Sequence, residues 1–175
     1  MDRSEIITML NCLQIKYTLR EHPPAETIDE IDTFNLPDSD TIVKNLFVRD
    51  DKKRNYYLLV VQKDRKVNLK QVQELLGSRP LSFASENDLF SYLGLKKGHV
   101  TPFGILNDMS CKVQVIIDES ILNYPFVGVH PNDNTATLWL SPGDLQKIIE
   151  THGNNVSYIK LTEKIIEGDS CFSQS

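Results

Sequence analysis

Cysteine and histidine are scarce in this chain of 175 residues, and neither is arranged as a set of ligands. The three cysteines, Cys12, Cys111 and Cys171, lie far apart and form no Cys-x-x-Cys pair. This spacing argues against a disulfide framework and a zinc knuckle, and it predicts reduced thiols. The four histidines lack the i, i+4 spacing of a metal site. We therefore expect no metal and no cofactor.

Long apolar runs are also missing. No segment approaches the roughly 18 consecutive apolar residues of a membrane span, and no apolar run follows a basic start as in a signal peptide. We expect a soluble, cytoplasmic protein that has no membrane partner. Because 40% of the residues are hydrophobic, the chain can bury one core. Residues 1–165 are predicted to form a single domain, and residues 166–175 a mobile tail.

Familiar enzyme signatures are absent as well: the chain has no Gly-x-Ser-x-Gly elbow and no phosphate-binding loop. Its net charge of −5 argues against a DNA-binding protein. Nevertheless, residues 44–70 carry nine Lys and Arg against three Asp, whereas residues 21–40 are acidic. The basic segment suits one end of an RNA. Alternatively, it is a solvated hairpin whose lysines protect an edge strand.

Periodicity predicts helices and strands in irregular order. A helix is expected over residues 4–16, with Ile6, Leu10, Leu13 and Tyr17 as its buried stripe. A capping box formed by Thr27 and Glu30 predicts a short helix that ends near Phe34. A helix should also start at Asn68, with Leu69, Val72, Leu75 and Leu76 on one face. Further helices are expected over residues 86–93 and after the N-cap Ser141, the latter with Leu145, Ile148 and Ile149 facing inward.

β-Branched and aromatic runs predict a hairpin of residues 41–50 and 55–62. Shorter strands are expected near residues 17–22, 81–84, 112–118, 126–130, 135–140 and 156–161. Because the strands pair as hairpins and not as repeated βαβ units, we predict an α+β fold. It should hold a mostly antiparallel mixed sheet with surrounding helices.

The stretch "KKGHVTPFGILND" at residues 96–108 places Gly98 and Pro102 around three residues. An ordinary turn explains this pair, because Gly permits a positive φ and Pro fixes its own φ and restrains Thr101. The alternative is a backbone-lined cradle for an anionic or carbonyl group. Polar residues also gather near Lys44 and Asn45 and in "GVHPNDNTAT", where His130 and Asn132 stand.

Three further segments accompany this loop in a fixed order: "EHPPAET" (21–27), "VKNLFVRD" (43–50) and "VGVHPNDNTATLWLSP" (127–142). Together the four segments resemble the YbaK and prolyl-tRNA synthetase-associated editing domains, which hydrolyse mischarged aminoacyl-tRNA. The resemblance covers roughly residues 1–162 and is nearest to the free-standing ProX branch, the alanyl-tRNA(Pro) deacylases. It implies a YbaK-like fold and a trans-editing hydrolase that removes alanine from tRNA(Pro).

The resemblance also implies which residues form the site. Lys44 matches the family's functional lysine, and Gly98 and Pro102 match its Gly-x-x-x-Pro loop, whose backbone would hold the ester near the terminal ribose. The substrate-binding residues implied by these segments, or proposed as apolar walls beside them, are Asn45, Phe47, His99, Val100, Thr101, Phe103, Gly128, Val129 and His130. His130 would line the pocket or be structural, and His22 is expected to be structural.

So sparse a site suits an aminoacyl ester, which is already activated and needs mainly orientation, an oxyanion-stabilising donor and a water. Four bulky residues, Phe47, Val100, Phe103 and Val129, are the expected walls of a pocket that admits alanine and refuses proline. The implied partner is the acceptor end of mischarged tRNA(Pro), with prolyl-tRNA synthetase as a further candidate. Alternatives are a deacylase for another mischarged tRNA, such as Cys-tRNA(Pro), or a non-catalytic module that binds tRNA or an amino acid.

Overall fold

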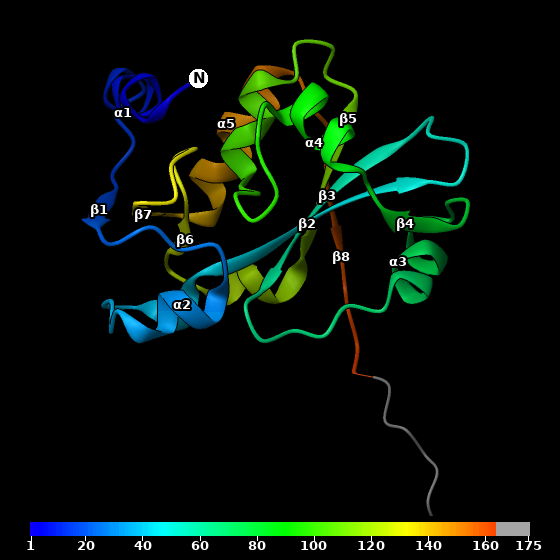
Figure 1. Cartoon of the computed structure of the whole chain (residues 1–175), viewed down its shortest axis with the longest axis horizontal. Coiled ribbons are helices and arrows are strands. Elements are labelled where there is room, and N and C mark those ends of the chain that lie inside the picture. Colours follow the sequence, from blue (N-terminus) through cyan, green and yellow to red (C-terminus); the bar gives the residue numbers. More distant parts are fainter. Residues whose placement is uncertain (164–175) are drawn as a thin grey trace, which may run out of the picture.

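Residues 1–163 are described by the computed structural model (Figure 1). The predicted tail at residues 166–175 lies outside them. The α-helices of this part are α1 (Arg3–Cys12), α2 (Ile28–Thr33), α3 (Leu69–Leu76), α4 (Glu86–Leu93) and α5 (Pro142–His152). The short 3-10 helices are η1 (Ser39–Thr41), η2 (Pro102–Asn107) and η3 (Glu119–Asn123). Within these residues, no helix is long and apolar enough to cross a membrane.

The strands form two sheets. The strands are β1 (Thr18–Glu21), β2 (Val43–Asp50), β3 (Tyr56–Gln62), β4 (Leu81–Phe83), β5 (Val113–Asp118), β6 (Val127–Val129), β7 (Ala136–Leu140) and β8 (Val156–Ile159). The larger sheet has the order β4-β2-β3-β5-β8, and the smaller has the order β1-β7-β6. The predicted α+β fold and the predicted β2–β3 hairpin are confirmed.

Strand direction differs between the two sheets. The smaller sheet is antiparallel throughout, whereas β5 runs parallel to both β3 and β8 in the larger one. Parallel neighbours need long crossovers, and here α3 and α4 lie between β3 and β5, while α5 precedes β8. The central strand β3 is consequently buried on both faces.

Helices cover both faces of the larger sheet (Figure 1). On one face, α1, α4, α5 and the smaller sheet enclose the main core, in which Ile6, Leu58, Leu93, Val115 and Leu138 are fully buried. On the other face, α3 packs over a second cluster through Val72. The short helix α2 sits apart on a small cluster that includes Ile31 and Trp139.

Capping chemistry fixes several helix starts where the sequence predicts them. Capping boxes are present at Thr27 and Ser85, and Ser141 caps α5 with Pro142 at its first position. The first helix is shorter than predicted, because the chain leaves it after Cys12 and turns at Gln14, whose φ is 56°.

Two leucines that the sequence places on the apolar faces of helices are exposed. Leu13 is 43% exposed because α1 has already ended, and Ile15 enters the core in its place. Leu75 is 47% exposed, although its neighbours on the predicted face pack inward. A helix of eight residues turns too narrow a face to its sheet to bury four leucine-sized side chains.

Candidate functional site

A cleft of about 260 Å³ opens where β2 begins, and we refer to it as the lysine cleft. Its lining comes from four segments that are distant in the sequence: the start of α2, the first residues of β2, the loop at 98–100 and the turn after β6. The lining residues are Ala25, Glu26, Thr27, Ile28, Ile31, Val43, Lys44, Asn45, Gly98, Val100 and His130. Five residues predicted to act together therefore meet: Lys44, Asn45, Gly98, Val100 and His130.

The cleft lies at this point because β2 is only partly paired. Its partner β4 pairs with Val48, Arg49 and Asp50 only. Residues 43–47 consequently form no ladder with β4, although the Ala84 N–H donates to the Phe47 carbonyl, and Ile42, just before β2, makes a single bridge to Gly128 of β6. An unpaired strand edge leaves room for loops to approach.

Lys44 is partly buried, and its ammonium group donates a hydrogen bond to the main-chain carbonyl of Arg65. That carbonyl is held in place by the Arg65 side chain, which pairs with Asp118 at 3.2 Å and donates to the carbonyl of Leu161 at 3.2 Å. Burial lowers the pKa of Lys44, and the charge of Asp64 partly opposes this shift. An ammonium has three donors, so two remain for a bound group.

The predicted Gly-x-x-x-Pro loop packs closely against the start of α2. Gly98 has a φ of +81°, and a Cβ built on it would lie 3.3 Å from Glu26 Cβ and 3.4 Å from the Glu26 carbonyl oxygen. Both the left-handed backbone and the close approach favour glycine here. The loop then turns, with the His99 N–H donating to the Lys96 carbonyl, and Pro102 starts η2.

Hydrogen bonds join this loop to the turn that carries His130. The hydroxyl of Thr101, which is fully buried, donates to the His130 carbonyl at 2.5 Å. Asn134 Nδ2, in the same turn, donates to the Ala25 carbonyl at 3.2 Å, and the Ala25 N–H returns a bond to the Asn134 carbonyl. The loop, the turn and the start of α2 therefore form one connected rim.

The His130 ring is held by its own turn. Its Nδ1 lies 2.9 Å from the Ala136 carbonyl, which can only accept, so Nδ1 carries the hydrogen and Nε2 keeps a lone pair in the neutral ring. Burial lowers the pKa of His130, while the bond to Ala136 acts in the opposite direction. A neutral His130 at pH 7 follows.

His22 makes contacts that suit a structural role. Its Nδ1 donates to the Pro23 carbonyl at 2.8 Å, and its Nε2 lies 2.9 Å from the hydroxyl of Thr137. The ring also stacks on Phe34, with a centroid separation of 5.3 Å. Both nitrogens are occupied, and His22 does not line the lysine cleft.

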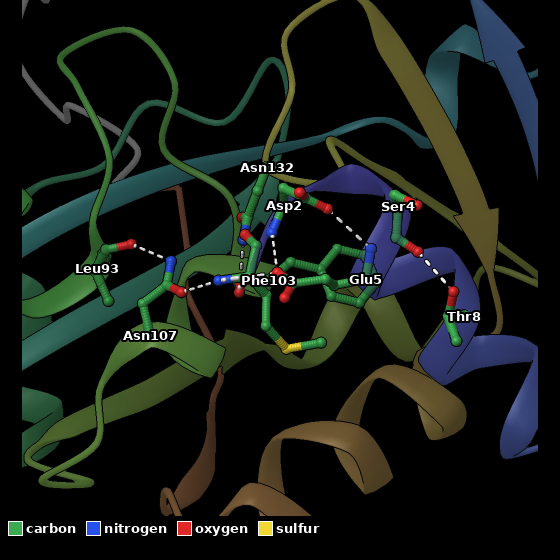
Figure 2. A network of polar contacts seen from close by, with 9 residues as sticks. Asp2, Ser4, Glu5, Thr8, Leu93, Phe103, Asn107 and Asn132 are labelled. Atoms are coloured by element: carbon green, nitrogen blue, oxygen red, sulfur yellow. Dashed lines mark hydrogen bonds and ion pairs between the residues drawn. The ribbon is translucent and has the colours of Figure 1, made fainter.

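Figure 2 shows how the segment after the loop is anchored. Asn132 Nδ2, from the turn that follows His130, donates to the carbonyl of Phe103 at 3.3 Å and to that of Met1 at 3.0 Å. At the far end of η2, Asn107 Nδ2 donates to the Leu93 carbonyl at 2.8 Å. Because η2 is held at both ends, the preceding loop has a fixed base.

The remaining predicted residues lie behind the cleft or beside it. Thr101, Pro102, Phe103, Gly128 and Val129 are buried and do not line the cleft. Phe103 and Val129 belong to the main core, so of the four expected wall residues only Val100 lines the lysine cleft.

Gly128, His99 and Phe47 have other surroundings. A Cβ on Gly128 would lie 2.7 Å from Ile42 and 2.9 Å from Trp139, which makes Gly128 a packing position. His99 borders a separate groove next to α1. Phe47 lines a second cleft, which shares a wall with the first.

Sequence reasoning missed the contribution of α2. Ala25, Glu26, Thr27, Ile28 and Ile31 form one side of the lysine cleft. The segment "EHPPAET" and the capping box at Thr27 located this helix, but nothing in its local pattern indicated what it faces. Among residues 1–163, no group of three or more His, Cys, Asp or Glu is placed to hold a metal ion.

The basic segment is partly neutralised by ion pairs. Lys63 pairs with Asp32 of α2 at 2.6 Å, and Arg49 lies 3.5 Å from Asp88. Arg65 pairs with Asp118, as described above. The exposed turn between β2 and β3, residues 51–55, keeps the cations Lys52, Lys53 and Arg54 at the far end of the hairpin from the cleft (Figure 1).

Comparison with known proteins identifies a family and several relatives. The family profile described as "Aminoacyl-tRNA editing domain" matches residues 22–148. "Prolyl-tRNA editing protein ProX" of Acetoanaerobium sticklandii is 48% identical over 159 residues, which cover 91% of this chain and 97% of that protein. "Prolyl-tRNA synthetase associated domain-containing protein 1" of Mus musculus is 33% identical over 157 residues, covering 87% and 92%.

Solved structures share the fold. The crystal structure of a hypothetical protein superposes with a TM-score of 0.68 at 22% identity, covering 89% of this chain and 97% of that one. At this level of identity the likeness extends to the arrangement of helices and strands alone.

Proposed function

The chain belongs to the aminoacyl-tRNA editing domain family and is an aminoacyl-tRNA deacylase, and from this premise we propose that it removes alanine from tRNA(Pro) in trans. The relative from Acetoanaerobium sticklandii, named as a prolyl-tRNA editing protein, supports the choice of tRNA. One structural observation supports the choice of site: Lys44, Asn45, Gly98, Val100 and His130 line a single cleft.

In this proposal the ester lies in the lysine cleft and water attacks its carbonyl carbon. The bond between that carbon and the ribose oxygen then breaks, which releases alanine and leaves a free hydroxyl on the tRNA. The backbone N–H groups of Gly98 and Val100, the two loop residues that line the cleft, stabilise the oxyanion, and the Lys44 ammonium adds positive charge. Placement supplies most of the acceleration, because an aminoacyl ester needs little further activation.

Selectivity for alanine follows from exclusion. A synthetase pocket shaped for proline gains only about 1–3 kcal/mol of discrimination against a side chain that lacks methylenes, so alanine must be cleared at a second site. In the lysine cleft, Val100, Val43, Ile28 and Ile31 provide the apolar walls. These walls would admit a methyl group and refuse a pyrrolidine ring.

The test is a panel of aminoacyl-tRNAs incubated with purified protein and scored for ester hydrolysis. Ala-tRNA(Pro) should be cleaved and Pro-tRNA(Pro) spared, whereas Val100→Ala should admit larger aminoacyl groups. Equal cleavage of the alanyl and prolyl esters by wild-type protein would refute the size-exclusion mechanism. Preference for Cys-tRNA(Pro) would assign the sister specificity.

The substrate is a tRNA, and two finer points belong to the proposal. We propose that the protein works in the cytoplasm, where tRNA is charged, and that it associates with prolyl-tRNA synthetase. A similar segment, 30% identical over 100 residues, forms part of the proline–tRNA ligase of Bacillus subtilis, which supports a shared place of action. Co-purification of the full chain with the synthetase would test the association.

A further inference from the structure

A second cleft of about 500 Å³ adjoins the lysine cleft, and we refer to it as the phenylalanine cleft. Asn45, Gly98 and Val100 line both clefts, so these three residues form a shared wall. If the ester is held in the lysine cleft, the nucleotide attached to it therefore extends across this wall toward the phenylalanine cleft.

The far side of the phenylalanine cleft is mainly apolar and aromatic, with Ser85 and Glu86 as its polar part. Phe47, Phe83, Ala84 and Leu89 contribute to it. Phe83 is 61% exposed, although its backbone is fixed by pairing with Val48 in the sheet. A large aromatic side chain that projects from a paired strand at the edge of a cleft is a surface on which a flat ring can stack.

The shared wall contains an unused acceptor. Asn45 Oδ1 is buried and has no hydrogen-bond partner among the described residues. A buried acceptor without a partner is destabilising, because it has lost its water without gaining a hydrogen bond. A ligand that brings a hydroxyl donor to this wall would supply that bond.

From these observations we propose that the phenylalanine cleft binds the nucleobase of the 3′-terminal nucleotide of the substrate, which in tRNA is adenine. The inference rests on the proposed function, because it takes the ester in the lysine cleft as its starting point. The ribose then spans the shared wall, where one of its hydroxyls donates to Asn45 Oδ1. The purine stacks on Phe83, and Lys97 at the same cleft favours the adjoining phosphate.

Phe83→Ala tests the stacking surface, and Phe90→Ala is the matched control. Phe90 is 66% exposed but does not line the cleft. Because stacking of one base on an aromatic ring changes affinity by about 5- to 150-fold, Phe83→Ala should raise KM about tenfold and leave kcat unchanged. Phe83→Trp should restore KM, and Phe90→Ala should behave as wild type.

The substrate offers the second arm of the experiment. Alanyl-tRNA whose terminal adenine has been removed should bind wild-type protein about tenfold more weakly and should bind Phe83→Ala with no further loss. Affinity is measured with a non-hydrolysable amide analogue, so that this arm reports on the cleft without requiring turnover. Circular dichroism confirms that each variant is folded.

The outcomes separate the two proposals. If wild-type protein hydrolyses Ala-tRNA(Pro) but Phe83→Ala leaves KM and analogue affinity unchanged, the phenylalanine cleft does not hold the base and the proposed function stands. If affinity depends on Phe83 and the adenine while no ester is cleaved, the cleft assignment stands and the deacylase function fails. A change of oligomeric state with unchanged affinity would make the cleft a protein interface and overturn the proposal.

Discussion

Gly98→Ala is the sharpest test of how the loop at 98–102 is positioned, because the chain offers a matched control. Gly77 and Gly98 both have left-handed backbones, with φ of +61° and +81°. A side chain in this region costs about 1–2 kcal/mol at either position. A Cβ on Gly77 meets nothing within 4 Å, whereas one on Gly98 lies 3.3 Å from Glu26 Cβ. Both variants should lose this backbone contribution to stability, and Gly98→Ala somewhat more because its methyl is crowded, as measured by urea denaturation.

Activity should separate the two variants. The added methyl at Gly98 must displace the loop or α2 by a few tenths of an ångström, and both line the lysine cleft. Because a misplacement of about 1 Å can cost on the order of 100-fold in rate, a shift of a few tenths of an ångström should lower kcat/KM of Gly98→Ala about three- to tenfold, or about 0.7–1.4 kcal/mol. Gly77→Ala should retain wild-type turnover of radiolabelled Ala-tRNA(Pro). If Gly98→Ala is as active as Gly77→Ala, packing against Glu26 does not position the loop.

Four further predictions concern charge, pH and metals. Lys44→Ala should abolish most deacylation while leaving the melting temperature near that of wild type; unchanged turnover would remove Lys44 from the site. Burial lowers the pKa of His130 below 6.5. At mildly acidic pH, His130 of the unfolded chain is therefore protonated to a greater extent than His130 of the folded chain. The free energy of unfolding should therefore fall as pH drops below about 6.5, and His130→Gln should reduce this slope in urea titrations. Replacing Lys52, Lys53 and Arg54 with Gln should weaken tRNA binding. It should also reduce the slope of log K against log salt concentration by about 0.7–0.9 for each phosphate that is no longer neutralised; an unchanged slope would make this turn a solvated edge. EDTA should not affect turnover, and an activity that EDTA removes and zinc restores would contradict this expectation.

Local signals in the sequence predicted most elements correctly. Thr27, Ser85 and Ser141 mark helix starts because capping depends only on residues within one turn. The hairpin of β2 and β3 was predictable for the same reason, since its two strands are joined by a short polar turn.

Features that depend on distant partners were not predictable. The parallel pairing of β5 with β3 and β8, and the division into two sheets, follow from packing and not from any local pattern. The same limit applies to burial: Val100 lines the cleft, whereas Phe103, three residues later, belongs to the core. Both are apolar residues close together in the sequence, and only their positions in the folded structure distinguish them.

The resemblance to a family supplied what periodicity could not, namely that Lys44, Gly98 and His130 belong together. These three residues line one cleft because Thr101 donates a hydrogen bond to the His130 carbonyl and because Gly98 packs against Glu26. Neither interaction has a signature in the sequence. The start of α2 was missed as a wall for the same reason.

The pairing of β1 with β7 has a consequence for synthesis of the protein. Thr18 lies opposite Trp139, so the first strand cannot pair until about 120 further residues have been made. At about 5–20 residues per second, this delay lasts roughly 6–24 s. During this time β1 is a short strand that contains Arg20 and Glu21, and such charged, short strands resist association with other chains. The turn that carries His130 lies between β6 and β7, so the cleft cannot be completed before residue 130 has been synthesised.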